Sequence, residues 1–375
     1  MIEMFNLLGK EVLLTAPTGR AAKRISELTG YEAKTIHRLL EVNFTDEKKM
    51  TFIRDAKYPL ECDVVIVDEM SMVDTEFFSS LLEPLPVNCH LVMVGDSDQL
   101  PSVGAGNVLK DLIDSNKVPS VRLNKIFRQA QQSLIITNAH RIISGQYPCL
   151  TEKKNNFFFF RRLGEESACD TICQLATNIL PKSRISPDDI QILCPMRKGH
   201  LGVEELNLKI QNIVNPSENN NELRSFLYSF REGDRVMQTK NDYQIEWYKD
   251  GEEGQGIFNG DIGKILEIDR IAGILLIDFD GRIVKYPRQS IENLELAYAI
   301  TVHKSQGCEF PIVIIPLLSD KTFNPLYFRN LLYTAVTRAK KMLIIVGRER
   351  DVFQMVDNNY KTYRETCLCE LICNA

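Results

Sequence analysis

The stretch "DVVIVDEMSM" at 63–72 decides how the first third of the chain folds. Its apolar run leads directly into two carboxylates, Asp68 and Glu69. Two similar runs lie on either side of it, "EVLLTAP" at 11–17 and "CHLVMVGD" at 89–96. Continuous apolar strands that end in polar residues are typical of a parallel sheet with helices on both faces. We therefore expect an α/β fold with functional side chains along one sheet edge.

A second set of apolar strands follows much later in the chain. It comprises "DIQILCP" at 189–195, "FPIVIIPL" at 310–317 and "KMLIIVG" at 341–347. The phenylalanine run "NNFFFFRR" at 155–162 is expected to be a further buried strand and not a base-stacking platform, because its four rings cannot all face one groove. These runs predict a second α/β domain.

The region between 233 and 294 has a different character, with Gly and Asp separating short alternating strands. This pattern predicts a small antiparallel barrel, and "DFDGRIV" within it predicts a tight hairpin turn. We expect three domains: 1–122 with a small polar insertion at 41–60, then 123–232 together with 295–375, and the inserted barrel at 233–294.

Bulk composition limits the classes of partner. The 375 residues carry 45 basic and 50 acidic side chains, for a net charge of -5, so any contact with nucleic acid must come from a local groove. The apolar run at 310–318 is far shorter than the roughly 18 residues of a membrane span. The N-terminus has no signal-peptide pattern, since Glu3 takes the place of a basic region. We expect a cytoplasmic protein without a membrane partner.

The ten cysteines raise the question of a metal site. Cys169 and Cys173 are four residues apart, and Cys367, Cys369 and Cys373 lie near the C-terminus. The chain has no CxxC pair and no histidine near either group, so the spacing of a zinc site is missing. We interpret the cysteines as scattered thiols of a reducing compartment.

The adjacent carboxylates point to phosphoryl chemistry. Successive side chains at a strand end point in different directions, so Asp68 and Glu69 can do separate jobs. Asp68 can hold Mg²⁺ through its water shell, and Glu69 can orient and deprotonate a water that attacks phosphorus. A simpler alternative is a helix N-terminus with acidic residues that favour its dipole.

Three further side chains fit the same chemistry. Gln99 follows the third strand and can donate to a phosphate oxygen while accepting from water. Arg128 in "LNKIFRQA" and Arg338 in "LLYTAVTRAKK" would place cations where negative charge develops. A surface salt bridge is the alternative for each arginine taken alone.

The turn "TVHKSQGCEF" precedes a buried strand and holds Thr301, His303 and Gln306, while Gly307 permits close backbone approach. A lone histidine more commonly has a structural role than a catalytic one, so we assign His303 an orienting role only.

Taken in order, "LLTAPTGRAAKR", "VIVDEMSMVD", "VGDSDQLPSVGAGNVLKDL", "LNKIFRQ", "TVHKSQGCEF" and "LLYTAVTRAKK" resemble the motifs of RecD-like superfamily 1 DNA helicases, the family of the exodeoxyribonuclease V alpha subunit. Six motifs in the right order are specific, and the resemblance covers nearly the whole chain. It implies two RecA-like P-loop NTPase motor domains with parallel sheets, the second interrupted by an SH3-like barrel.

The resemblance also implies ATP and Mg²⁺ as cofactors, single-stranded DNA and duplex forks as substrates, 5′ to 3′ movement, and possible nuclease or helicase partner subunits in recombination or repair. The insertion at 41–60 matches the family's strand-separating pin. The site residues carried over from the family fall into three groups. Catalytic roles fall to Asp68 (also the metal ligand), Glu69, Gln99, Arg128 and Arg338; nucleotide contacts to Gln306, Gly307 and Glu309; DNA contacts to Pro17, Thr18, Gly19, Arg20, Arg197, Asn241, Thr301 and His303.

One departure from the family pattern stands out. No G-x-x-x-x-G-K-[S/T] sequence occurs in the 375 residues. That loop supplies the backbone amides and lysine that cradle the β- and γ-phosphates. We interpret the chain as a helicase truncated after this loop, and inactivity of the isolated chain is an expectation. Two alternatives stay open: a non-catalytic nucleic-acid-binding scaffold, and an RNA helicase or relaxase-linked motor of the same superfamily.

Overall fold

The computed structural model describes residues 1–44, 50–123, 132–151, 156–217, 221–225, 227–319, 326–359, 364 and 366–374. The chain divides into two compact units. The first comprises Met1–Lys125 and Lys361–Ala375, and the second comprises Ile126–Tyr360. The chain therefore passes between the units twice.

The first unit is built on a four-stranded parallel sheet in the order β2-β1-β5-β6. Its strands are β1 (Val12–Ala16), β2 (Ala33–Thr35), β5 (Val64–Val67) and β6 (His90–Met93). β5 pairs with β1 on one side and β6 on the other, with Val67 opposite Thr15 and Met93. The parallel sheet expected from the three apolar runs is confirmed. The short strand β2 was not predicted from the sequence.

Helices cover this sheet because its apolar residues project from both faces. α2 (Gly19–Thr29) packs its Ala21 and Ala22 against Ala16. The larger core lies around Val65 and Val67 and receives side chains from the remaining helices. Those helices are α3 (Ile36–Leu39), α4 (Thr75–Leu82), α5 (Val108–Asp114) and α12 (Leu368–Asn374). α1 (Ile2–Leu7) contacts β1 and buries none of its side chains.

The insertion expected at 41–60 contains an antiparallel strand pair, β3 (Val42–Phe44) and β4 (Met50–Phe52). Phe52 anchors it by packing near His37 and against the first unit's core. An ion pair between Arg54 and Glu41 closes the base of the pair at 2.7 Å. The hairpin is thus fixed at its base to the sheet domain.

The second unit contains a five-stranded parallel sheet in the order β18-β8-β19-β20-β7. The strands are β7 (Phe157–Arg161), β8 (Ile190–Cys194), β18 (Ala299–Thr301), β19 (Phe310–Leu317) and β20 (Ala339–Gly347). The phenylalanine run forms the edge strand β7, with Phe157 fully buried. The prediction of a strand at this position is confirmed.

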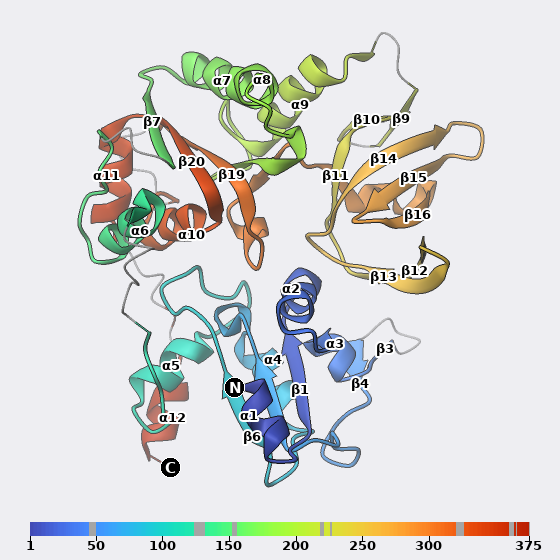
Figure 1. Cartoon of the computed structure of the whole chain (residues 1–375), viewed down its shortest axis with the longest axis vertical. Coiled ribbons are helices and arrows are strands. Elements are labelled where there is room, and N and C mark those ends of the chain that lie inside the picture. Colours follow the sequence, from blue (N-terminus) through green and yellow to red (C-terminus); the bar gives the residue numbers. More distant parts are fainter. Residues whose placement is uncertain are drawn as a thin grey trace. The chain divides into compact units, whose positions relative to one another are not determined.

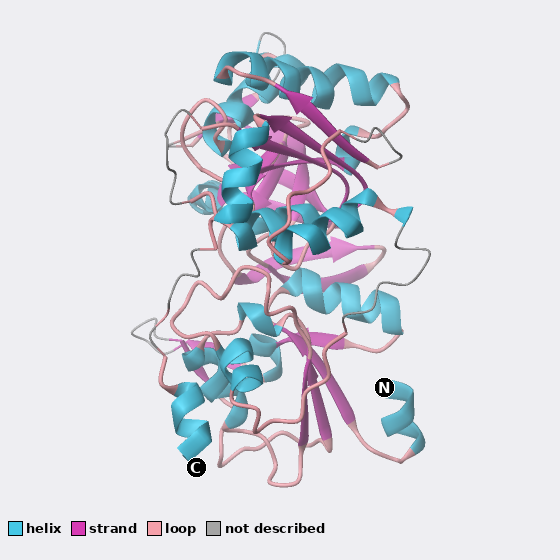
Figure 2. Cartoon of the chain, turned by 90° about the vertical axis from the view of Figure 1, so that its left-hand side faces the viewer, coloured by secondary structure: helices cyan, strands magenta, loops and turns pink. Residues whose placement is uncertain are grey.

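Helices lie on both faces of this second sheet (Figures 1 and 2). α7 (Glu165–Gln174), a π-helical turn (Leu175–Ile179), α8 (Leu180–Lys182) and α9 (Val203–Val214) cover one face. α6 (Leu134–Ile143), α10 (Arg329–Thr337) and α11 (Glu349–Asp357) pack together on the other. Buried strands with helices on both sides explain the continuous apolar runs in the sequence.

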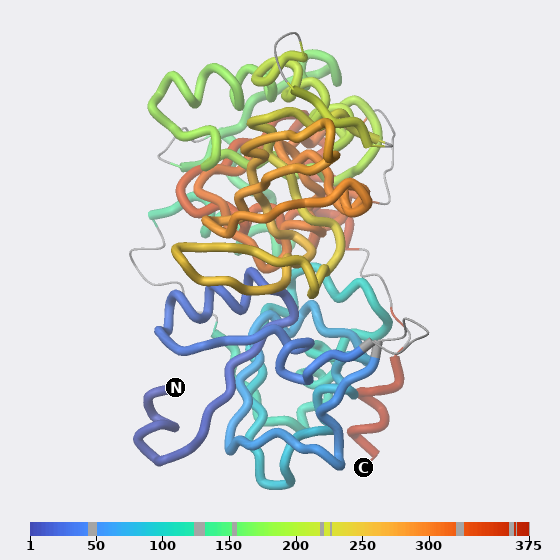
Figure 3. Tube along the Cα trace, turned by 90° about the vertical axis from the view of Figure 1, so that its right-hand side faces the viewer, coloured from blue at the N-terminus to red at the C-terminus, as the bar shows by residue number. Residues whose placement is uncertain are grey.

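The region expected to form a barrel is a seven-stranded antiparallel sheet in the order β13-β12-β16-β15-β14-β11-β17, whose hairpins run in yellow and orange in Figure 3. Its strands are β11 (Arg235–Gln238), β12 (Asp242–Lys249), β13 (Glu252–Ile257), β14 (Ile262–Asp269), β15 (Ile274–Phe279), β16 (Arg282–Pro287) and β17 (Leu294–Leu296). The turn at Asp280 and Gly281, both with positive φ, joins β15 to β16, so the expected hairpin is confirmed.

The antiparallel region differs from its expected limits of 233–294 at both ends. β9 (Glu222–Arg224) and β10 (Ser229–Arg231) precede it, and Phe230 is buried in the same core. At the other end, Leu296 of β17 pairs with Val236 of β11. Hydrophobic burial of Phe230 and the ladder to β11 recruit these flanking residues, and neither shows in the alternating pattern.

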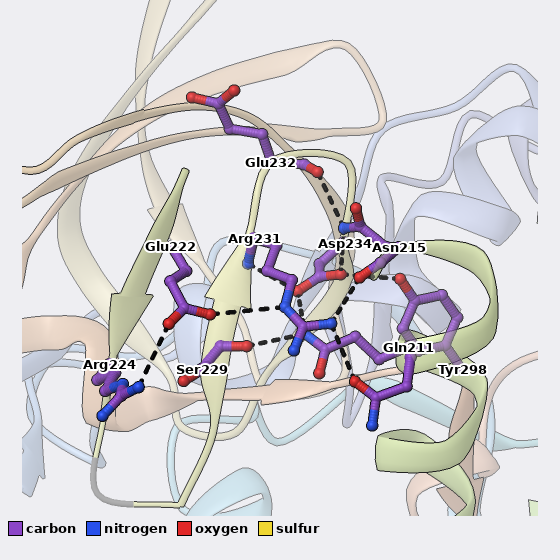
Figure 4. Close-up of polar contacts among 10 residues, drawn as sticks. Gln211, Asn215, Glu222, Arg224, Ser229, Arg231, Glu232, Asp234 and Tyr298 are labelled. Carbon is purple, nitrogen blue, oxygen red and sulfur yellow. Dashed lines mark hydrogen bonds and ion pairs between the residues drawn. The ribbon is translucent and has the colours of Figure 1, made fainter. Parts of the chain in front are cut away.

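Asp234 ties the antiparallel sheet to the parallel-sheet part of the second unit (Figure 4). Its carboxylate accepts hydrogen bonds from Gln211 Nε2 at 2.5 Å, Asn215 Nδ2 at 2.7 Å, the Tyr298 hydroxyl at 3.0 Å and the Arg231 backbone N–H at 2.8 Å. Burial raises the pKa of Asp234 and outweighs these hydrogen bonds, which lower it. Side chains from α9 and from the segment before β18 thus converge on a residue that opens β11.

The C-terminal residues differ from the expected extent of the second motor domain, 295–375. The division by contacts places Lys361–Ala375 in the first unit, where α12 packs against α5. Leu368 and Ile372 contact the first unit's core, which supplies the physical reason for the return.

Within the described residues, no helix combines the length and the apolar character that crossing a bilayer requires.

Replacing Asp234 by Ala should lower the free energy of unfolding of the second unit by about 3 kcal/mol, because buried donors lose their acceptor. The chain has one tryptophan, Trp247, which lies in β12, so its fluorescence in urea reports on this sheet directly. Asp188→Asn, which removes the charge of an exposed carboxylate, is the control and should leave the midpoint within error. Equal midpoints for Asp234→Ala and the control would contradict the anchoring role.

Candidate functional site

The carboxyl ends of three strands meet at one edge of the first sheet. The N–H of Asp68 donates to Thr15 O at 3.0 Å, and the N–H of Val94 donates to Val67 O at 2.8 Å. The N–H of Met70 then donates back to Val94 O at 3.0 Å. These backbone bonds hold the residues after β1, β5 and β6 beside one another, where the sequence analysis expected the site.

Glu69 adopts a left-handed backbone conformation with φ 54°. This conformation is uncommon for a residue with a Cβ and is frequent at functional sites. The Glu69 N–H donates to Asp68 Oδ1 at 2.8 Å, and a 3-10 turn, Met70–Met72, follows immediately. Both residues are half-buried. The helix that follows, α4, begins only at Thr75 and is capped by Asp74, so Asp68 and Glu69 are not its N-terminal acidic residues.

Gln99 lies on the loop that follows β6. Its Nε2 donates to Asp96 Oδ2 at 3.4 Å. Its Oε1 is buried and meets no hydrogen-bond donor among the described residues. A buried acceptor without a partner costs about 1–3 kcal/mol, so such atoms usually serve a bound molecule or an ordered water. Gln99 Oε1 is therefore an acceptor that the described residues leave available.

The segment Pro17–Arg20 runs from the end of β1 into α2 and so reaches the same edge. Thr18 is the N-cap of α2, and its Oγ1 accepts a hydrogen bond from the Ala21 N–H at 3.2 Å. Gly19 is the first residue of the helix, and Arg20 is half-buried beside it. A helix N-terminus with a basic side chain suits a phosphate group.

In the second unit, a charged cluster lies beside the carboxyl ends of β8 and β18. Arg197 donates to Glu204 at 2.9 Å and to Glu295 at 2.7 Å, and Lys304 donates to Glu295 at 2.8 Å. Thr301 ends β18 and accepts a hydrogen bond from the Lys304 N–H at 3.3 Å. Predicted DNA-contact residues are thus brought together with an acid that pairs with both cations.

Burial by itself would raise the pKa of Glu295. The hydrogen bond and charge of Lys304 and the charge of Arg197 outweigh this effect, so the pKa of Glu295 lies below its usual value. A lowered pKa means that the ionised form contributes stability above the unfolded-state pKa and loses it as the pH falls through the folded-state pKa. Glu295 is therefore charged at neutral pH and competes with any anion for Arg197 and Lys304.

Two other predicted DNA contacts are exposed in the second unit. His303 lies on the 3-10 turn His303–Ser305 that follows β18. Asn241 lies between β11 and β12, where its Nδ2 donates to the Tyr243 hydroxyl at 3.1 Å and its Oδ1 accepts from the Asn259 N–H at 2.9 Å. Asn241 therefore belongs to the antiparallel sheet, whereas the charged cluster borders the parallel one.

The residues expected to contact nucleotide gather before β19. Gln306 is buried, and Gly307 has φ 70°, which permits the reversal into the strand. Arg338 is only 3% exposed and donates to Cys308 O at 3.1 Å and Thr334 O at 3.3 Å. Glu309 forms an ion pair with Lys340 at 3.1 Å. Arg338 thus binds the backbone of the very turn that carries Gln306, Gly307 and Glu309.

The remaining predicted site residue, Arg128, lies outside the described residues. Sequence reasoning missed Glu295, because it lies in β17 and belongs to none of the motifs. In the described part of the chain, no group of three or more His, Cys, Asp or Glu side chains is arranged to hold a metal ion. Mg²⁺ needs no such cage, since one or two carboxylates together with substrate phosphates and waters are its usual ligands.

Three family models match successive parts of the chain. An AAA domain matches residues 2–156, an ATP-dependent RecD-like DNA helicase SH3 domain matches 206–279, and a UvrD-like helicase C-terminal domain matches 296–346. The first match contains the first sheet, the second contains much of the antiparallel sheet, and the third contains β18 and β19 and most of β20.

Curated relatives match over almost the entire chain. An ATP-dependent RecD2 DNA helicase from Deinococcus radiodurans is 35% identical over 365 residues, which cover 97% of this chain and 47% of the relative. A RecBCD enzyme subunit RecD from Mycolicibacterium smegmatis is 28% identical over 94% of this chain and 65% of its own length. The chain thus spans about half to two thirds of these relatives.

Solved structures share the fold. Bacteroides Pif1 bound to single-stranded DNA aligns with a TM-score of 0.52 at 20% identity, covering 92% of this chain and 84% of that one. Pif1 helicase from Candida albicans aligns with a TM-score of 0.50 at 18% identity, covering 100% of this chain and 91% of that one.

The Glu295 cluster generates a prediction about nucleic-acid affinity. Glu295→Gln should release Lys304 and remove one of the two carboxylate partners of Arg197, which still pairs with Glu204. Binding of a single-stranded oligonucleotide should tighten by about threefold to tenfold, with a salt slope steeper by about 0.7 for each additional phosphate contact. Fluorescence anisotropy across a salt series measures both quantities.

Glu267→Gln removes the same charge from an exposed position in β14 and is the matched control. An unchanged salt slope in Glu295→Gln, or an equal gain in affinity for the control, would show that the cluster does not contact the oligonucleotide.

Proposed function

Because the chain belongs to the RecD-like superfamily 1 DNA helicases, we propose that it is the motor region of an ATP-dependent helicase that moves 5′ to 3′ along single-stranded DNA. The observation that carries the proposal is the convergence of Asp68, Glu69 and Gln99 at one sheet edge, where Gln99 Oε1 is buried and has no donor among the described residues.

The proposed chemistry assigns a separate task to each of these side chains. Asp68 would hold Mg²⁺, which supplies positive charge to the phosphate oxygens. Glu69, on the left-handed turn directly after Asp68, would accept the proton of the water that attacks the γ-phosphorus. Gln99 accepts a hydrogen bond from the attacking water through Oε1 and donates to a γ-phosphate oxygen through Nε2, exchanging its long bond to Asp96.

The second unit is proposed to supply further nucleotide contacts. Arg338 would sense the nucleotide through the turn it binds, and Gln306, Gly307 and Glu309 lie on that turn. The residues of the chain contain no G-x-x-x-x-G-K-[S/T] loop, so the cradle for the β- and γ-phosphates is not formed by that motif within them.

The DNA track is proposed to use phosphate contacts, which fix position without reading sequence. Pro17–Arg20 would offer the N-terminus of α2, and the second unit would add Arg197, Asn241, Thr301 and His303. The β3–β4 pair is proposed to help separate the strands of a duplex, since it is anchored at its base by Phe52.

The cellular setting is proposed from the relatives. RecD of Mycolicibacterium smegmatis is named a RecBCD enzyme subunit, and we propose that this chain works in recombination or repair, in the cytoplasm, with nuclease or helicase subunits as candidate partners.

ATP hydrolysis by the 375-residue chain tests the proposal. Because the 375 residues lack the G-x-x-x-x-G-K-[S/T] loop, we expect hydrolysis by this chain to be weak or absent. Any hydrolysis should be stimulated by a single-stranded oligonucleotide and should fall about 100-fold or more in Glu69→Gln, because a positioned general base contributes 10²–10⁴-fold. A coupled assay of ADP release, with and without DNA, provides the measurement.

Glu76→Gln, an exposed carboxylate on α4, is the matched control and should hydrolyse ATP like the unaltered chain. Hydrolysis that survives Glu69→Gln would remove the catalytic role of Glu69. Salt-sensitive DNA binding without any hydrolysis would fit both a helicase region without its phosphate loop and the non-catalytic scaffold. Hydrolysis gained by adding a G-x-x-x-x-G-K-[S/T] segment before Met1 would support the helicase, and its continued absence would support the scaffold. A clear preference for RNA over DNA of the same sequence would overturn the assigned substrate.

A further inference from the structure

The last described segment of the chain completes the first unit although it follows the second in sequence. α12 lies beside α5 (Figure 1), and its Leu368 and Ile372 pack against the core that includes Leu109 and Leu112. The Thr366 hydroxyl donates to the buried carboxylate of Asp111 at 2.7 Å. The segment is therefore integrated into the first unit by both apolar and polar contacts.

Arg364 binds the loop that follows Gln99. One guanidinium nitrogen, Nη1, donates to Ser102 Oγ at 3.2 Å, to Gly106 O at 2.9 Å and to Gly104 O. The other, Nη2, donates to Ser102 O. A single planar guanidinium thus gathers carbonyls from both arms of the loop, a geometry that an ammonium cannot reproduce.

The same loop also contacts the beginning of α4. The Thr75 N–H donates to Ala105 O at 3.0 Å. A Cβ at Gly104 would clash with the Asp74 carboxylate, and a Cβ at Gly106, which has φ 91°, would clash with the Thr75 hydroxyl. The loop therefore has glycine where Asp74 and Thr75 come closest, and it is held by both Arg364 and the start of α4.

We propose that Arg364 is a positioning residue: it holds the Ser102–Gly106 loop against α4 and thereby sets the conformation of the segment that carries Gln99. Two features connect the loop to Gln99. First, the chain from Gln99 to the loop is short and buried: Leu100 is 1% exposed, and Ser102, two residues further on, is 3% exposed. Second, the loop leads directly into α5, the helix against which α12 packs.

In this arrangement the C-terminal segment both packs against the core of the first unit and positions the loop that follows Gln99. The segment assigned to the first unit begins at Lys361, and its Arg364 binds the loop that follows Gln99. The catalytic consequence of this contact rests on the proposed function of Gln99, whereas the positioning of the loop does not.

Amide hydrogen exchange of the full 375-residue chain tests the positioning. In Arg364→Ala, peptides that cover 98–107 should exchange at least about tenfold faster, while peptides that cover β5 and β8 keep their rates, because local openings leave the rest of a domain intact. Arg364→Lys keeps the charge but not the planar fork and should give an intermediate rate.

Arg224→Ala is the matched control, because Arg224 is largely exposed and makes one ion pair at 3.5 Å. Unchanged exchange of 98–107 in Arg364→Ala, or an equal acceleration in all peptides of the first unit, would overturn the proposal, the latter because it indicates general destabilisation.

A parallel hydrolysis assay separates this proposal from the proposed function. Arg364→Ala should lower kcat severalfold at nearly constant KM for ATP, and the double variant with Gln99→Ala should be no slower than Gln99→Ala alone, as expected for a residue that acts through Gln99. If the chain hydrolyses no ATP even with a G-x-x-x-x-G-K-[S/T] segment added before Met1, the proposed function fails, and the exchange result still decides the positioning. An additive double variant would show that Arg364 acts elsewhere.

Discussion

Backbone hydrogen bonds at the end of β5 support the rest of the first unit. Asp68 is bonded to β1 through Thr15 O, and the chain after Glu69 returns to Val94 beyond β6. These bonds leave Glu69 no regular strand or helix conformation, which accounts for its φ of 54°. The backbone of the acid pair is thus fixed by bonds to both neighbouring strands and by the bond from the Glu69 N–H to Asp68 Oδ1.

The second unit depends on a comparable constraint with a different chemistry. Two sheets of opposite type have to be joined, and the joint is a buried carboxylate that accepts four hydrogen bonds (Figure 4). Burying a charge is costly unless its acceptors are satisfied, so Asp234 stabilises only the arrangement in which α9, Tyr298 and Arg231 all reach it. The same unit uses Glu295 to hold Arg197 and Lys304 at the edge of the parallel sheet.

Arg338 and Arg364 make similar contacts, but only the role of Arg338 could be predicted from the sequence. Both bind backbone carbonyls of a turn next to predicted site residues, Arg338 through Cys308 O and Arg364 through the Ser102–Gly106 loop. Arg338 lies in a motif that the sequence analysis could interpret. Arg364 lies in a segment without a motif, 262 residues after Ser102 in the chain, and its role emerges only from the fold.

The sequence by itself determined the parallel sheets, the antiparallel region and the acid pair at a strand end, because each depends on a local apolar pattern and on the polar residues directly after it. It located Gln99 and the turn at Gln306–Glu309 for the same reason. Only the tertiary structure decided that Gln99 Oε1 is left without a donor among the described residues, that Glu295 neutralises two cations, and that the C-terminal segment returns to the first unit. These features join residues far apart in the chain through burial and hydrogen bonding, and no local periodicity encodes such contacts.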